Sequence, residues 1–80
     1  MKLEKNYFKV ELKIDYENHI HIEKDFFNEK ANACTCFSEK FKLAEYGYLQ
    51  NRFDIYSVTL AEVFTDEKRT VIHKIRKAPL

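Results

Sequence analysis

Apolar and charged residues alternate with a period of two near the start of the chain. The apolar positions are Phe8, Val10, Leu12, Ile14 and Tyr16, and charged residues occupy the positions between them. Such strict alternation predicts a strand with one buried face and one exposed face. Glu17 and Asn18 follow as a tight turn, because asparagine tolerates the dihedral angles of turns.

The alternation resumes after this turn and predicts a second strand. We expect Ile20, Ile22 and Phe26 to keep the inward parity of the first strand. The polar residues are expected on the outer face: His19, His21 and Glu23. Two alternating segments joined by a short turn indicate a hairpin, so residues 7–26 are predicted to form one antiparallel pair.

The hydrophobic period then changes from two to between three and four. The apolar positions are Ala33, Phe37, Phe41, Ala44 and Tyr48, which lie on one stripe of an α-helix. We predict a helix over about 28–46, with Asp25 or Asn28 as its N-terminal cap. Gly47 is the only glycine, and it is expected to end the helix in the left-handed conformation.

The remaining chain is predicted to form a second hairpin. Residues 53–65 are rich in β-branched and aromatic side chains, as strands are. Their parity changes within the segment: Phe53 and Ile55 have one parity, and Tyr56, Val58 and Leu60 have the other. A β-bulge, or a strand covered on both faces, would explain that change. Residues 65–68 form a polar turn, 70–76 form the last strand, and Pro79 cannot continue the ladder.

The predicted order is therefore ββαββ, an α+β fold. Four strands form one antiparallel sheet, and the single helix packs on one of its faces. The 80 residues are enough for one domain, which we take to be 1–80. In this arrangement the second face of the sheet and its edge strands are the surfaces available for binding.

Composition narrows the class of protein. The seven Phe and five Tyr and the net charge of only +1 favour a folded core over disorder. The same near-zero net charge disfavours strong electrostatic attraction to nucleic acid or to a membrane. Residues 1–6 lack the apolar region of a signal peptide, and no apolar run is long enough to span a bilayer. We expect a cytoplasmic protein in which Cys34 and Cys36 are free thiols.

Candidate catalytic and metal-binding groups do not combine into a site in the sequence. His19, His21 and His73 lie on predicted strands, the two cysteines lie on the predicted helix, and their spacings match no common metal motif. Cys34 near the helix N-terminus would have a lowered thiol pKa, but no partner base can be identified. There is no glycine-rich phosphate loop. We therefore expect no metal, no cofactor and no enzymatic activity.

The C-terminal strand carries the clearest concentration of charge. Residues 68–80 contain five basic residues and no acidic residue. Lys74 and Arg76 share a parity with Thr70 and Ile72, and Tyr56 is expected on the neighbouring strand. The predicted contact residues for a partner or RNA are Tyr56, Lys68, Arg69, Lys74, Arg76 and Lys77. Basic residues beside an aromatic ring on a sheet can bind RNA, although lysines also protect edge strands from aggregation.

Recognition of another protein accounts for more of the features. Four tyrosines exceed what a small core can hold: Tyr7, Tyr46, Tyr48 and Tyr56. Tyrosine is enriched at protein interfaces, and an edge strand can pair with a strand of a partner. The same surfaces would suit a homodimer in which two sheets meet at their edges or faces. RNA binding and homodimer formation remain the alternatives.

The layout resembles small accessory proteins of T-even-type phages, which include antitoxin-like inhibitors that neutralise host ribonuclease toxins. The resemblance is carried by Phe8-Lys9-Val10-Glu11-Leu12, by the central helix with Phe37, Phe41 and Ala44, and by Glu62-Val63-Phe64 before the basic strand. The high content of Lys, Asn, Ile, Phe and Tyr is also similar to that of proteins encoded by AT-rich phage genomes. The resemblance implies a non-catalytic inhibitor that blocks a host protein, such as a toxin nuclease, by direct contact.

Overall fold

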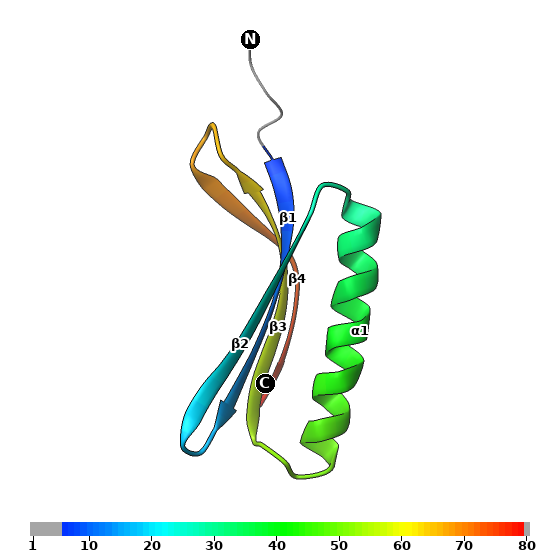
Figure 1. The fold of residues 1–80 in the computed structure, drawn as a ribbon, viewed down its shortest axis with the longest axis vertical. Helices are drawn as coiled ribbons and strands as arrows, with labels where there is room; N and C mark the ends of the chain where they lie inside the picture. The colour runs from blue at the N-terminus through cyan, green and yellow to red at the C-terminus, as the bar shows by residue number, and fades with distance from the viewer. Residues whose placement is uncertain (1–5, 80) are drawn as a thin grey trace.

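A computed structural model describes residues 6–79 and shows four strands and one helix. The elements are β1 (Asn6–Tyr16), β2 (His19–Phe27), α1 (Lys30–Leu49), β3 (Ile55–Phe64) and β4 (Arg69–Ala78). The strands form one antiparallel sheet in the order β2-β1-β3-β4, and α1 lies across one face of it (Figure 1). The predicted ββαββ order and α+β class are confirmed.

The core lies between α1 and the two central strands. β1 contributes Phe8, Val10, Leu12 and Ile14, and β3 contributes Tyr56, Val58 and Leu60. Small residues on α1 (Ala33, Ala44 and Gly47) are buried beside the larger Phe37. They let the helix backbone approach the sheet closely, which keeps the thin core of a short chain densely packed.

The predicted orientation of β2 is wrong. Tyr16 and His19 are partners across the two-residue turn, and directly paired residues in antiparallel strands point to the same face. Since Tyr16 faces the helix side, the histidine-bearing face of β2 does so as well: His19, His21 and Glu23. The apolar residues expected inside instead point to the open face of the sheet, where they are about half exposed: Ile20, Ile22 and Phe26.

Both predicted helix ends also differ from the structure. α1 begins after Glu29, which makes no side-chain capping bond, so neither Asp25 nor Asn28 is the cap. Gly47 lies inside the helix rather than after it and has no positive φ. The left-handed residue is Asn51, with φ of 60°. The Asn51 N–H donates to the Tyr48 carbonyl and the Arg52 N–H donates to the Gly47 carbonyl, which together form a Schellman motif.

The bulge expected within residues 53–65 is not there. Phe53 precedes β3, and Ile55 lies on the open face at 49% exposure, which accounts for the change of parity. The bulge of the sheet is in β4. β3 itself pairs with β1 without interruption. Opposite it, Leu60 pairs with Lys74 and Ala61 pairs with Ile72, so His73 is an extra residue in β4. Lys74 and Arg76 therefore share the helix side, whereas Thr70 and Ile72 lie on the open face. The prediction that all four share one face is wrong because the bulge reverses the parity.

Candidate functional site

The predicted basic residues do not form one continuous surface. Lys68 is in the turn between β3 and β4, with φ of 54°. Arg69 starts β4, where its guanidinium pairs with the carboxylate of Glu67 and lies 4.1 Å from the ring centroid of Phe64. Lys77 pairs with Ser57 on the open face of the sheet. By its register Arg69 has the same helix-side parity as Lys74 and Arg76, but its charge is paired with Glu67, whereas Lys77 lies on the opposite face.

Lys74 and Arg76 do point the same way, toward the helix. The Nζ of Lys74 lies 5.8 Å from the ring centroid of Phe37, and the Cζ of Arg76 lies 5.8 Å from that of Phe41. Because α1 packs mainly over β3 and β1, these long side chains cover the aromatic rings at the margin of the helix. The charged heads remain accessible on the exposed strand β4.

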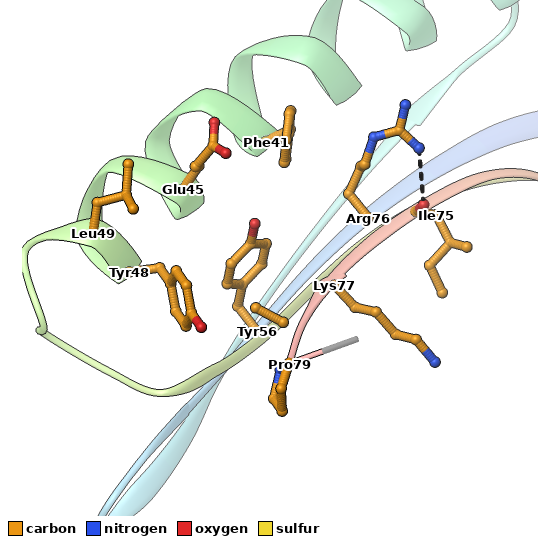
Figure 2. A pocket seen from close by; sticks show the side chains of 10 residues that line it. Phe41, Glu45, Tyr48, Leu49, Tyr56, Ile75, Arg76, Lys77 and Pro79 are labelled. Atoms are coloured by element: carbon orange, nitrogen blue, oxygen red, sulfur yellow. Dashed lines mark hydrogen bonds between the residues drawn. The ribbon is translucent and has the colours of Figure 1, made fainter.

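A groove runs between the C-terminal half of α1 and β4, with a volume of about 690 Å³ (Figure 2). Its walls come from three elements: Phe41, Glu45, Tyr48 and Leu49 of α1, Tyr56 of β3, and Arg76 and Ala78 of β4, with Pro79 at one end. Ile75 and Lys77 of β4 border the groove as well, but their side chains point to the open face of the sheet. The lining is mostly apolar, and Arg76 and Glu45 bring opposite charges to it. A groove of this kind suits an apolar side chain with a polar group beside it.

Tyr56 forms the floor of this groove. It is 5% exposed, so the prediction that it contacts a partner from an open surface is wrong. Its ring packs edge-to-face with that of Tyr48, at 5.8 Å between centroids, and with that of Phe53. Burial, together with the carboxylate of Glu45, raises the pKa of the Tyr56 hydroxyl. The hydroxyl is therefore neutral at physiological pH, when it can donate or accept a hydrogen bond.

The helix side of the groove was missed in the sequence. Phe41 and Tyr48 follow the predicted apolar stripe of α1, and both are only half-buried. Tyr48 was also among the tyrosines expected to exceed the core, but its place beside β4 was not predicted. Leu49 stands outside that stripe and is 69% exposed. One feature of the sequence indicates this side of the groove. With Leu49 added to the stripe, the apolar surface of the C-terminal half of α1 is wider than a single core-facing stripe.

A polar cluster, separate from the groove, links β2 to the helix. Lys40 pairs with Glu23, and the Nζ of Lys40 lies 3.5 Å from the Oδ2 of Asp25. The hydrogen bond from Lys40, reinforced by His21, lowers the pKa of Glu23, and the same bond raises the pKa of Lys40. This cluster replaces the apolar packing that the sequence predicted for β2, because the polar face of that strand is the one nearest the helix.

The cysteines and histidines are held apart. Cys34 and Cys36 are free and half-buried, as predicted for free thiols. Burial, and then the carboxylate of Asp25 with its Oδ2 3.8 Å from the sulfur, raises the pKa of Cys36, which makes it a poorer nucleophile. His21 pairs with Glu23, and His73 pairs with Glu62. Within residues 6–79, no three candidate ligands gather closely enough to hold a metal ion.

Comparisons of the chain with protein-family models, curated proteins and solved structures found no match. Among the described residues, no helix combines the length and apolar content that crossing a membrane requires.

Proposed function

We propose that this chain is a non-catalytic binding protein that holds a segment of a partner protein in the groove between α1 and β4. The observation that carries the proposal is the position of this groove. Its apolar lining lies directly beside β4, an edge strand of the sheet. A partner segment can therefore bury a side chain in the groove while its backbone pairs along the edge strand.

The charges around the groove favour a partner segment with an acidic residue. Arg76 donates one N–H to the carbonyl of Ile75 at 3.3 Å, and the guanidinium carries further donors that suit a carboxylate. Lys74 lies on the same side of β4, two positions along the strand. An apolar anchor followed by Asp or Glu is the segment that this arrangement fits best.

The resemblance to phage accessory proteins supports a finer proposal for the partner. In that setting the protein acts in the cytoplasm of the host cell and blocks a defence protein or a toxin nuclease by direct contact. Such an inhibitor needs a binding surface and no catalytic group. The groove and β4 supply that surface, with Lys74 and Arg76 as the contact residues and Tyr56 as the floor.

RNA binding along β4 is the second candidate. It is favoured by the five basic residues at 68–77. It is weakened by their directions, because Lys77 points away from Lys74 and Arg76. Contacts with phosphates release counterions, so this alternative predicts an affinity that falls steeply with salt.

The proposal is tested by affinity capture from a bacterial host lysate with and without ribonuclease, using three forms of the protein. The wild-type chain and the control variant Lys42→Glu, altered on the exposed outer side of α1, should capture the same protein in stoichiometric amount after ribonuclease treatment. Arg76→Glu should fail to capture this protein, although it changes the net charge by the same amount as the control Lys42→Glu. Capture that is equal for all three forms would contradict the groove assignment. Recovery of RNA, or loss of every partner after ribonuclease, would favour RNA binding instead.

A further inference from the structure

The open face of the sheet, opposite α1, exposes large apolar side chains. They lie on three strands, with relative exposures of 44–59%: Ile20, Ile22 and Phe26 on β2, Ile55 on β3, and Ile72 and Ile75 on β4. The solvent face of an antiparallel sheet is ordinarily polar. β-branched and aromatic residues gathered on one such face indicate a contact surface. We propose that this face binds a second copy of the same chain.

The charges on the central strand identify the second copy as the occupant. On the open face of β1 the residues alternate in sign: Lys9, Glu11, Lys13 and Asp15. Two identical faces can meet around a two-fold axis that crosses the strands at the level of Leu12. Lys9 then lies opposite Asp15 of the second copy, and Glu11 lies opposite Lys13 of the second copy. Every such pair joins opposite charges.

An axis parallel to the strands would give a different result. If it ran along β1, each residue would lie opposite its own counterpart, so Lys9 would face Lys9 and Glu11 would face Glu11. Like charges placed opposite each other are destabilising. An axis between β1 and β3 would instead place the charges of β1 over the uncharged Ala61, Thr59 and Ser57 of the second copy. Of these orientations, only the one in which β1 of the two copies run in opposite directions joins opposite charges.

The apolar residues fit the same orientation. A two-fold axis that crosses the strands leaves their lateral order unchanged, so β2 lies over β2 of the second copy and β4 lies over β4. Glu23 pairs with Leu12 and marks the level of the axis on β2. Ile20 is consequently opposite Phe26 of the second copy, and Ile22 is opposite Lys24.

On β4 the axis passes at the level of Arg76, so Ile75 lies opposite Lys77 and Ile72 lies opposite Pro79 of the second copy. Lys24 and Lys77 are on edge strands, where their aliphatic stems can cover the isoleucines while the ammonium groups reach solvent.

The overlap of the two faces reaches the minimum for a specific interface. Rotation about the level of Leu12 superposes about nine residues each of β1 and β2 and about seven each of β3 and β4, because the ends of β3 and β4 near Phe64 and Arg69 extend past the overlap. At roughly 3.3 Å per residue and about 4.8 Å between strands, this overlap covers roughly 500 Å². The two copies then bury about 1,000 Å² in total, the lower bound for a specific interface. The groove lies on the helix side of the sheet, so the dimer presents two accessible grooves and can bind two partner segments.

The first test is the molar mass in solution, measured by sedimentation over a range of protein concentrations. The wild-type chain should approach twice its monomer mass of 9.7 kDa. Ile22→Lys and Ile72→Lys should each raise the dimer dissociation constant at least tenfold, while Lys42→Glu leaves it unchanged. Circular dichroism confirms that each variant is folded. A wild-type monomer at all concentrations, or a dimer unaffected by both open-face variants, would overturn the proposal.

Exchanging the charges of Glu11 and Lys13 tests how the two copies are oriented. The test includes a recovery of binding as well as a loss. Glu11→Lys and Lys13→Glu should each weaken the homodimer, because like charges then face each other across the axis. An equimolar mixture of the two variants should restore the dimer, since both pairs again join opposite charges. No recovery in the mixture, with both variants folded, would overturn the two-fold arrangement. Recovery would support it whether or not the groove binds the proposed partner.

Discussion

The ring of Phe53 lies against the backbone of Gly47, so closely that a Cβ atom at position 47 would be 2.7 Å from the Cε2 atom of the ring. Contacts of that length do not occur without movement of one of the two groups. Phe53 in turn packs edge-to-face against Tyr56 on the floor of the groove. The only glycine of the chain therefore supports the loop between α1 and β3 and, through it, the groove.

Gly47→Ala is expected to destabilise the protein by about 1–3 kcal/mol, the cost of overpacking a filled core. The sign of this change in stability tests the contact with Phe53, because alanine in place of glycine inside a helix otherwise stabilises by roughly 1 kcal/mol. Denaturant unfolding measures the difference, with Ser38→Ala on the exposed side of α1 as the control. The double variant with Phe53→Leu should recover part of the loss. A stabilising Gly47→Ala would show that the contact is absent.

The left-handed conformation of Asn51 gives a second prediction. Asn51→Ala should cost about 1–2 kcal/mol of stability, because a Cβ is disfavoured at positive φ and asparagine tolerates it better than alanine does. Asn51→Gly should be neutral or slightly stabilising. Thermal unfolding of the two variants provides the comparison. Equal melting temperatures for both would mean that the Schellman motif does not form in solution.

The ion pair between Lys40 and Glu23 should make stability depend on pH. The pKa of Glu23 is lowered by folding, so its contribution is complete above the ordinary pKa of about 4.3 and is lost as the pH falls through the lower, folded value. The pKa of Lys40 is raised, so its contribution is complete below about pH 10.4 and is lost as the pH rises through the folded value.

Lys40→Met should therefore lower the free energy of unfolding near pH 7 by about 0.2–1 kcal/mol, the range for solvent-exposed pairs. It should also raise the pKa of Glu23, which a nuclear magnetic resonance titration measures directly. Lys42→Met on the exposed side of α1 is the matched control. If both variants give the same titration curve for Glu23, the pair does not persist in solution.

Cys36 should react slowly with thiol reagents. Burial and the nearby Asp25 raise its pKa, so little thiolate is present at pH 8. In a Cys34→Ser background, the rate of modification by a disulfide reagent should be well below that of glutathione. Asp25→Asn should increase the rate by removing one of the two causes. A rate as fast as that of glutathione would contradict the half-buried position of the thiol.

The order of elements could be predicted from the sequence because it follows from local periodicity. The alternation at Phe8 to Tyr16 and the helical stripe through Phe37 each act within one element. The face of β2 could not be obtained by continuing the count, since a two-residue turn pairs Tyr16 with His19 and shifts the parity by one. The apolar residues of β2 therefore reached the open face, where a second copy is proposed.

The candidate site was less predictable for a related reason. Its basic side was visible as a run of charge, but the bulge at His73 decides which of those residues share a face. Its helix side depends on where α1 lies across the sheet, which leaves Phe41 and Tyr48 at the margin beside β4. Both facts arise from packing between elements rather than from the residues within one element.

The most direct test of the central claim is amide hydrogen exchange of the protein alone and in complex with the captured partner. Occupation of the groove predicts slower exchange in two segments, residues 41–49 of α1 and the β4 strand, where a paired partner strand would protect the outward-facing amides. Exchange in β2 should be the same in both states. Protection confined to β2, with β4 unchanged, would contradict the claim that the partner binds between α1 and β4.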